Sequence, residues 1–201
     1  MIYLASSSPR RAELLRQIGV EFKVLAVNID ESPLVMEKPE QYVRRIAKAK
    51  ADAAGHDLDG EGVPILAADT TISIGNEIVG KPDDPTHCRC ILSKLSGKTH
   101  QVLTCVALRY RGQTHLTLSL NQVKFRVIEA QEIATYCSSK EPIDKAGAYA
   151  IQGKAAIFVE KLEESYSSVM GLPLFDFARH QLFLLLRGVR RQLPMCCASS
   201  C

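Results

Sequence analysis

The sequence predicts an α/β or α+β sandwich with a central cleft. Short apolar runs alternate with segments of helical periodicity, which is typical of mixed α and β architectures. Two long alternating segments, 99–110 and 114–127, meet at Arg111-Gly112 and predict an antiparallel pair with one buried face. The 201 residues suffice for one large domain or two small lobes, with a sizeable core.

The expected elements of the first half have start and stop signals. Ser8 is a natural N-cap, Pro9 fits the first helical position, and Gly19 can end the helix. Gly75-Asn76 is a two-residue turn of the glycine-first kind. In chain order we expect a short apolar strand from Ile2, a helix from Pro9 to Gly19, a strand over 22–27, a helix over 39–54, a strand over 64–69 and a hairpin over 70–79.

The second half is expected to contain the long antiparallel pair among several helices. In order we expect a helix capped by Thr86 and ending at Leu95, the pair itself, a helix over 130–138, a strand over 156–161 and an amphipathic helix from Pro173 to Gly188. Nothing repeats, and no low-complexity linker divides the chain. We therefore expect residues 1–190 to form one two-lobed domain and residues 191–201 to be a disordered, cysteine-rich tail.

Composition and charge argue against several classes of protein. A net charge of +3 is too small to indicate nucleic-acid binding. The longest apolar stretch near the end, 182–186, is far too short to span a bilayer. Residues 1–20 lack the apolar region and cleavage site of a secretory signal. We therefore expect a cytoplasmic protein that binds neither nucleic acid nor a membrane.

Seven cysteines are many for a cytoplasmic protein. The cluster His87-Cys88-Arg89-Cys90 and the cysteines of the tail lack the paired C-x-x-C spacing of structural zinc sites. An odd count without a secretory signal argues against a disulfide framework. We favour reduced thiols over either alternative.

Two arginines occupy an unfavourable place at the start of the first helix. A helix N-terminus carries partial positive charge, so Arg10 and Arg11 each cost about 0.3–1 kcal/mol there. A bound anion would explain this cost. It would be held by the two guanidinium groups, by backbone N–H groups and by the hydroxyls of the preceding serines, among them Ser6 and Ser8. The alternative is a solvated basic helix start.

Two carboxylates are expected at strand ends. Asp69 follows the apolar run 65–68, and Glu31, preceded by Asp30, follows the strand over 22–27. Carboxylates from separate strand ends can share a divalent cation that also contacts a triphosphate, and Asp69 can instead activate water. The alternatives are a turn-capping aspartate and a surface acidic pair.

Two lysines and one glutamine complete the candidate site. Lys50 interrupts a stripe of the helix over 39–54 that is otherwise apolar, so it either snorkels to solvent or reaches into a cleft. Lys81 stands in a loop between Gly80 and Pro82. The small residues of segment 145–153 permit close ligand approach, and Gln152 offers an amide to a base edge, the alternative being a packed turn. No P-loop, G-x-G-x-x-G, H-E-x-x-H or G-x-S-x-G motif is present.

An ordered set of motifs over about residues 2–188 resembles the Maf family of nucleoside triphosphate pyrophosphatases. The segments that carry the resemblance are Leu4-Ala5-Ser6-Ser7-Ser8-Pro9-Arg10-Arg11, Asp30-Glu31, Ala67-Ala68-Asp69-Thr70, Gly80-Lys81-Pro82, residues 96–102, residues 145–153 and the stretch from Ser165 to Pro173. The resemblance implies an elongated, mixed-sheet Maf/ITPase-like fold with a cleft between two lobes, often as a homodimer. It also implies hydrolysis of a nucleoside triphosphate to monophosphate and pyrophosphate with a divalent cation, Mg²⁺, Mn²⁺ or Co²⁺.

Segment 145–153 is similar to the branch of the family that acts on dTTP, UTP and some modified pyrimidine nucleotides. By this resemblance Asp69 matches the proton acceptor, while Arg10, Thr70 and Gln152 match specificity positions. Cleft positions are matched by Glu31, Lys50 and Lys81, and we add Ser6, Ser8 and Arg11 to the phosphate grip. The competing interpretation is a nucleotide-binding regulator that inhibits septum formation, with weak or no turnover.

Overall fold

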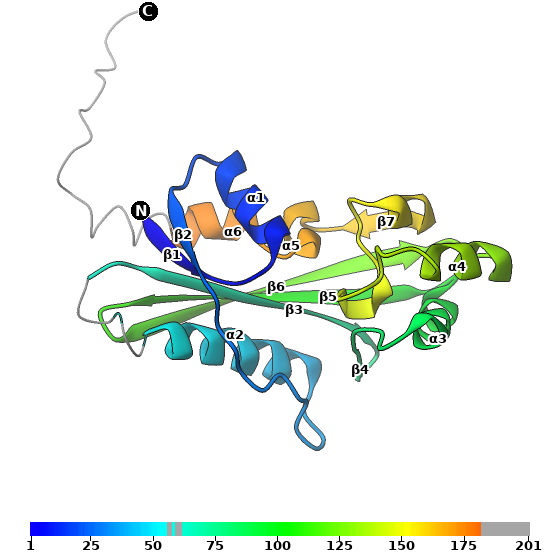
Figure 1. The fold of residues 1–201 in the computed structure, drawn as a ribbon, viewed down its shortest axis with the longest axis horizontal. Helices are drawn as coiled ribbons and strands as arrows, with labels where there is room; N and C mark the ends of the chain where they lie inside the picture. Colours follow the sequence, from blue (N-terminus) through cyan, green and yellow to red (C-terminus); the bar gives the residue numbers. More distant parts are fainter. Residues whose placement is uncertain (56–57, 59–61, 182–201) are drawn as a thin grey trace, which may run out of the picture.

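A seven-stranded mixed sheet runs through the part of the chain that the computed structural model describes, residues 1–55, 58 and 62–181 (Figure 1). The strands are β1 (Ile2–Ala5), β2 (Phe22–Leu25), β3 (Ile65–Ile74), β4 (Glu77–Val79), β5 (Thr99–Tyr110), β6 (Gln113–Phe125) and β7 (Val159–Glu163). Their order is β2-β1-β3-β5-β6-β7, with β4 beside β3. Strand β1 is parallel to β2 and β3, and the other pairs are antiparallel. The predicted mixed α/β fold is confirmed.

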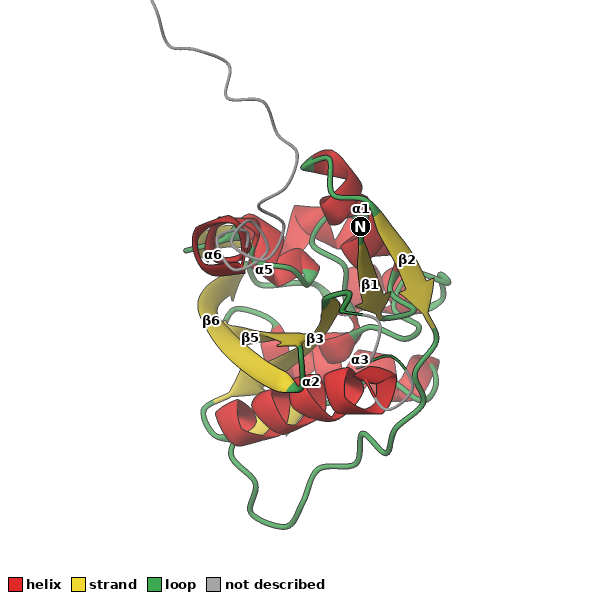
Figure 2. Ribbon diagram, turned by 90° about the vertical axis from the view of Figure 1, so that its left-hand side faces the viewer, coloured by secondary structure: helices red, strands yellow, loops and turns green. Residues whose placement is uncertain are grey.

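Helices cover both faces of this sheet (Figure 2). They are α1 (Pro9–Gln17), α2 (Pro39–Gly55), α3 (Pro85–Leu95), α4 (Ala130–Cys137), α5 (Tyr166–Met170) and α6 (Leu174–Asp176). Helix α2 lies on one face, and α1, α5 and α6 lie on the other (Figures 1 and 2). Each face has its own apolar core, the smaller one beneath α2 and the larger one on the opposite side. No helix among the described residues has the length and apolarity needed to cross a bilayer.

Several predicted boundaries are wrong, for local reasons. The strand over 64–69 and the first strand of the hairpin form one continuous strand, β3, so Asp69 lies inside a strand. Strand β2 ends at Leu25, which leaves Glu31 in the following loop. Asp84 caps α3 in place of Thr86, because its carboxylate accepts the His87 N–H at 2.8 Å. Strand β7 starts at Val159, since residues 154–158 form a 3₁₀ turn.

The end of the chain is described only in part. After α6 the backbone continues as one π-helical turn over Phe177–Gln181. The remainder of the helix predicted to end at Gly188, and the tail predicted over 191–201, lie outside the described residues. The division into one domain and a disordered tail therefore stays a prediction.

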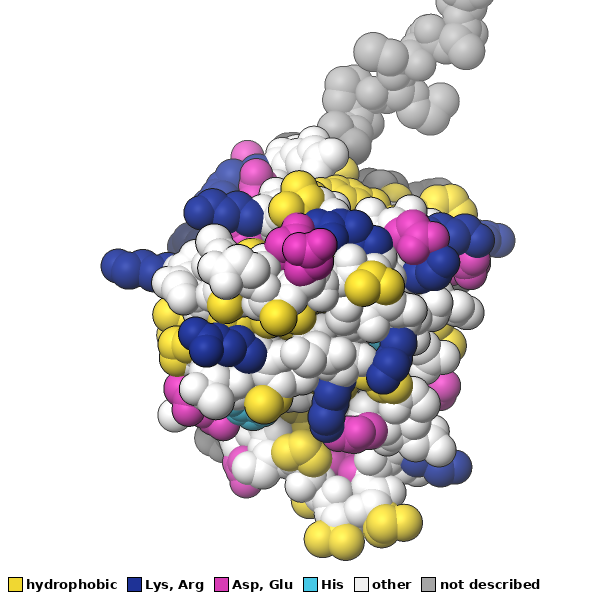
Figure 3. All heavy atoms as spheres, turned by 90° about the vertical axis from the view of Figure 1, so that its right-hand side faces the viewer, with side chains coloured by type: hydrophobic (Ala, Val, Ile, Leu, Met, Phe, Trp, Pro, Cys, Tyr) yellow, Lys and Arg dark blue, Asp and Glu magenta, His cyan; other side chains and the backbone are white. Residues whose placement is uncertain are grey.

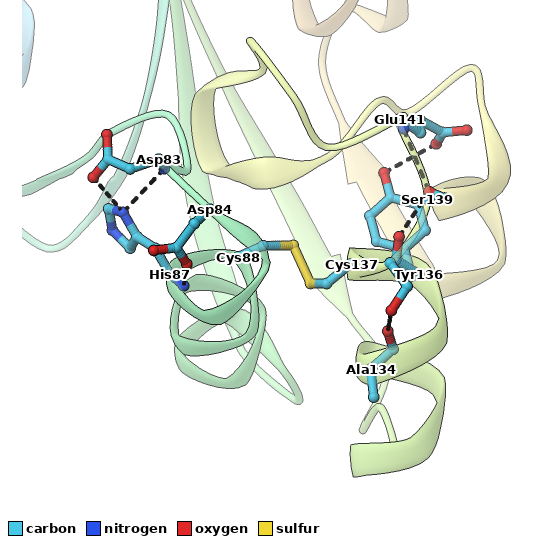
Figure 4. The surroundings of a disulfide bond; sticks show 10 residues. Asp83, Asp84, His87, Cys88, Ala134, Tyr136, Cys137, Ser139 and Glu141 are labelled. Carbon is cyan, nitrogen blue, oxygen red and sulfur yellow. Dashed lines mark hydrogen bonds and ion pairs between the residues drawn. A yellow bond between two sulfur atoms is a disulfide. The ribbon is translucent and has the colours of Figure 1, made fainter.

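The expectation of reduced thiols is wrong for two cysteines. Cys88 of α3 and Cys137 of α4 form a disulfide, with their Cα atoms 5.8 Å apart and 49 residues apart in sequence (Figure 4). A disulfide sulfur cannot bind zinc as a thiolate, so the cluster around His87 is not a zinc site. Cys90 and Cys105 are free. No motif marked the pairing, because it depends on two helices meeting in three dimensions.

The face shown in Figure 3 carries charges of both signs in a dispersed pattern, with lysines and arginines scattered among acidic and neutral side chains. Apolar side chains gather at its lowest point, where the loop before α2 protrudes. Leu34, Val35 and Met36 of this loop are exposed, the last two almost completely.

Candidate active site

The candidate site lies at a gap in the sheet. Strand β3 pairs with β5 along one edge over 65–73. Along its other edge it pairs with β1 over 65–67 and with β4 over 72–74. Residues 68–71 therefore face no strand on that edge within the described part of the chain. A cavity of about 650 Å³ opens beside them, within the size range of small-molecule sites.

The two faces of β3 bring different chemistry to this gap. Because side chains alternate along a strand, Asp69 falls on the face of Ile65 and Ala67, which pack in the core beneath α2. Thr70 falls on the opposite face, toward α1 and α5. The cavity thus receives a carboxylate from one face and a hydroxyl from the other.

An alternating row of acids and lysines lies on the α2 side. Lys50 Nζ contacts Asp69 Oδ1 at 2.8 Å and Glu31 Oε1 at 2.7 Å. Lys81 Nζ contacts the other Glu31 oxygen at 2.9 Å. Asp69 is only 7% exposed, and the Lys50 side chain 13%. The structure therefore directs Lys50 toward the cleft and brings together four predicted site residues from α2, β3 and two loops.

The lysines keep Glu31 ionised. Burial by itself favours the neutral acid, but hydrogen bonds and charges from Lys50 and Lys81 outweigh it and hold the pKa of Glu31 at about 2. The carboxylate therefore stays negative at any pH near neutrality. This charge is available to bind either an ammonium group or a metal cation.

Acid is expected to weaken folding through Glu31. An ordinary glutamate has a pKa near 4.5, so between that value and about 2 the unfolded chain binds a proton that the folded chain does not. Stability from this group is therefore complete above about pH 5 and is lost as the pH falls toward about 2. In urea unfolding, we expect the native chain to lose stability more steeply across this window than Glu31→Gln. An equal pH dependence of the unfolding free energy in the two proteins would contradict the lowered pKa of Glu31. The effect is modest because the side chain is one-third exposed.

On the opposite face Arg11 is held by three acceptors. Its Nε donates to Gly171 O at 2.9 Å, Nη1 to Ser6 Oγ at 3.0 Å and Nη2 to Thr70 Oγ1 at 3.2 Å. Burial lowers the pKa of Arg11, and the negative charges of Asp69 and Glu31 counteract this. The guanidinium thus ties the start of α1 to β3 and to the end of α5, while lining the cavity.

A buried hydrogen-bond network behind Thr70 was missed by the sequence analysis. Thr104 lies opposite Thr70 in the β3–β5 register, with the two hydroxyl oxygens 3.0 Å apart. Thr104 donates to Ser168 O at 2.8 Å, so its single proton is used and Thr70 donates to Thr104. Asn121 then donates to Ser168 Oγ at 2.8 Å. A polar residue inside the apolar run of β5 was the available signal for Thr104.

Arg10 and the serine turn, residues 6–8, line the cavity, and Arg10 forms fewer ion pairs and hydrogen bonds with described residues than Arg11 and the lysines do. Arg10 lines the cavity, and burial lowers its pKa. No carboxylate among the described residues forms an ion pair with it. Ser6 Oγ accepts the Ser8 N–H at 3.2 Å and fixes the turn. Ser8 is the N-cap residue of α1, but its hydroxyl makes no capping bond and lines the cavity.

The far wall is built from segment 145–153. Gln152 is exposed and lines the cavity together with Lys145 and Tyr149. Gly147 has a φ of 66°, and its N–H donates to Gly80 O at 3.0 Å, next to Lys81. A side chain at Gly147 would also collide with Ile72. Glycine is therefore required here both by the backbone conformation and by the close packing.

Asp69 and Glu31 are two carboxylates of the cavity whose chemistry fits a divalent cation. In the described part of the chain, no three or more histidine, cysteine or acidic side chains are placed so that they alone could hold a metal ion. Both carboxylates nevertheless contact the same ammonium of Lys50, so they converge on one positive charge. One or two carboxylates supplemented by substrate phosphates are the ligands that Mg²⁺ typically uses.

Comparison with known proteins identifies relatives over almost the whole chain. The family profile described as "Maf-like protein" matches residues 1–181. A protein of Aromatoleum aromaticum is 47% identical over 89% of this chain and 92% of its own, and one of Nitrosomonas europaea is 48% identical over 87% and 90%. A protein of Methylobacillus flagellatus is 47% identical over 96% and 94%. All three relatives carry the name "dTTP/UTP pyrophosphatase".

Proposed function

The chain belongs to the Maf family, and we propose that it hydrolyses dTTP and UTP to the monophosphate and pyrophosphate. The observation that carries this proposal is the cavity at the gap beside β3. Cationic side chains surround a buried carboxylate there, as a polyphosphate and an attacking water require. Lys50, Lys81 and Arg11 are held by partners within the protein, and Arg10 forms no ion pair with a described residue, so it is offered to substrate.

The reaction joins a water oxygen to the α-phosphorus and breaks the bond from that phosphorus to the bridging oxygen of the β-phosphate. Asp69 accepts the proton of the water, and pyrophosphate leaves with the electron pair of the broken bond. Lys50 holds the Asp69 carboxylate in place through the 2.8 Å contact. Arg10, Lys81 and the serine turn bind the phosphate oxygens, on which negative charge gathers in the transition state.

A divalent cation, Mg²⁺, Mn²⁺ or Co²⁺, fits this site with Asp69 and Glu31 as its protein ligands. When bound, it supplies electrostatic stabilisation to the phosphate oxygens. Lys50 contacts both carboxylates and limits their repulsion. A carboxylate that ligates a cation is a weaker base, so the two roles of Asp69 compete, and for the chemical step itself we propose the role of base.

Base selection is assigned to Gln152, supported by Thr70 and Arg10. The amide of Gln152 lines the cavity and offers both a donor and an acceptor to a pyrimidine edge. A base that leaves this amide unpaired loses affinity. The Thr70 hydroxyl already donates to Thr104, so it faces substrate only as an acceptor.

A panel of dTTP, UTP, CTP, ATP and GTP with Mg²⁺ or Mn²⁺ tests the proposal through release of pyrophosphate. We expect kcat/KM for dTTP and UTP to exceed that for ATP and GTP by about 100-fold. Absence of release from every nucleotide would contradict the enzymatic function, and equal rates would contradict the pyrimidine assignment. Comparing UTP with 5-methyl-UTP extends the panel to modified pyrimidines. The septum-regulator interpretation is not favoured, because the relatives carry enzyme names. Location in the cytoplasm and a homodimer stay predictions.

A further inference from the structure

Glu141 lies behind the wall that carries Gln152. It follows α4 in a short turn and is not one of the residues that line the cavity. Ser139 shapes this turn, because its hydroxyl donates to Tyr136 O at 2.7 Å and accepts the Glu141 N–H at 3.3 Å (Figure 4). This turn directs the Glu141 side chain back toward Tyr136 of α4.

The carboxylate of Glu141 accepts three hydrogen bonds. Oε2 accepts the Lys154 N–H at 3.0 Å, and Oε1 accepts the Ala155 N–H at 3.2 Å and the Tyr136 hydroxyl at 3.0 Å. The two backbone groups open the 3₁₀ turn Lys154–Phe158, whose first N–H groups have no partner within the turn. Glu141 therefore fixes the backbone immediately after Gln152 and Gly153.

Gly153 packs directly against the Glu141 carboxylate, and no space is left for a side chain. Its φ of −103° is open to any residue, so backbone conformation does not require glycine. A Cβ at this position would, however, collide with the Glu141 carboxylate. The chain from Gln152 to Ala155 is thus packed onto Glu141 as well as hydrogen-bonded to it.

The other end of the support is rigid. Tyr136 is 5% exposed, and its ring packs edge-on against Phe158, with centroids 5.3 Å apart. The next residue, Cys137, is bound to Cys88 of α3 by the disulfide (Figure 4). The Tyr136 hydroxyl therefore holds the Glu141 carboxylate from a fixed position.

We propose that Glu141 is a positioning residue for base selection, acting through the backbone that presents Gln152. The proposal rests on the proposed pyrophosphatase function. Glu141 touches neither the cavity nor the acid–lysine row, so it acts on binding of the base and leaves the chemical step at Asp69 unchanged. A contact of the base that is made equally in ground and transition states affects KM and not kcat.

The test compares Glu141→Ala, Glu141→Gln and Gly153→Ala by pyrophosphate release. For Glu141→Ala we expect KM for dTTP to rise about tenfold with kcat within about twofold, and kcat/KM for GTP to change by less than about twofold. Glu141→Gln keeps one acceptor oxygen and is expected to restore part of the selectivity. Exchange of the Lys154 and Ala155 amide hydrogens should accelerate in Glu141→Ala.

Gly153→Ala provides a double-mutant cycle that separates this mechanism from a general loss of stability. In the native background the added methyl displaces the Glu141 carboxylate and should reproduce the loss of selectivity. In the Glu141→Ala background the methyl has room, so the second change should add less than about twofold. Glu160→Ala is the matched control, because Glu160 is an exposed carboxylate paired with Lys124 and its loss should leave selectivity unchanged.

Three results would overturn the proposal. They are unchanged selectivity in Glu141→Ala, an equal loss of kcat/KM for all nucleotides, and a full additional effect of Gly153→Ala in the Glu141→Ala background. A native chain that releases no pyrophosphate from any nucleotide would instead contradict the proposed function.

Discussion

Replacing Asp69 by asparagine is expected to lower kcat for dTTP by about 10³-fold, within the range for loss of a general base, with little change in KM. Asparagine preserves the shape of the side chain but cannot accept the proton of the attacking water. It also loses the ionic contact with Lys50 Nζ. Because Asp69 lies inside β3, with neighbours on both sides in the strand, we expect the variant to fold. Steady-state kinetics and a thermal unfolding curve measure the two effects separately.

Asp52→Asn is the matched control for this experiment. Asp52 is on α2, as Lys50 is, and forms ion pairs with Lys48 and Arg109, but it does not line the cavity. We expect its kcat to stay within about twofold of the native value, since these ion pairs lie outside the cavity and their loss affects stability and not the chemical step. A kcat for Asp69→Asn above about one-tenth of the native value would contradict the assignment of Asp69 as the base.

The sequence identified site residues that break a local rule. Arg10 and Arg11 stand at the wrong end of a helix for their charge, and Lys50 interrupts an apolar stripe. In the structure all three line the cavity. Such conflicts between local preference and observed residue are visible without coordinates, because they need only the periodicity of one helix.

Residues that obey local rules were not identifiable in this way. Threonine suits a β-strand, so Thr104 inside the apolar run of β5 was only a weak signal, and Asn121 and Ser168 stand among other polar residues of β6 and α5. They form a network only because the β3–β5 register places Thr104 opposite Thr70 and α5 packs over β5. Glu141 was not identified for the same reason, since its partners lie 5 to 14 residues away, in α4 and in the 3₁₀ turn that follows Gly153.

The position of Asp69 shows the limit of reading strand ends from composition. The apolar run ends at Ala68, but β3 continues through six more residues to Ile74. What ends beside Asp69 is the neighbouring strand β1, whose last pair is Ala5 with Ala67. The carboxylate of Asp69 therefore does lie beside a strand end, but the strand that ends there is β1 and not β3.

Removal of the Cys88–Cys137 disulfide is expected to destabilise the fold strongly. The bond closes a loop with a sequence separation of 49 residues, and in the chain-entropy model such a loop contributes about 4 kcal/mol, with typical measured values of about 2–4 kcal/mol. Cys88 and Cys137 are 1% and 3% exposed, so the native bond is protected until α3 and α4 separate. Urea unfolding of the Cys88→Ser/Cys137→Ser variant measures the loss. Serine adds buried hydroxyls, and so Cys88→Ala/Cys137→Ala should be measured beside it.

Reductant separates the contribution of the bond from that of the side chains. Pre-reduction of the unfolded native chain, followed by refolding in reductant, should lower its unfolding free energy toward that of the alanine variant. The alanine variant itself should be insensitive to reductant. Cys90→Ser, on the same helix, changes an exposed free thiol and should leave both stability and the response to reductant as in the native chain. A native chain with equal stability in oxidised and reduced form would contradict the prediction. Because Tyr136 adjoins Cys137, the reduced chain is also expected to show some of the selectivity loss of Glu141→Ala, at unchanged kcat.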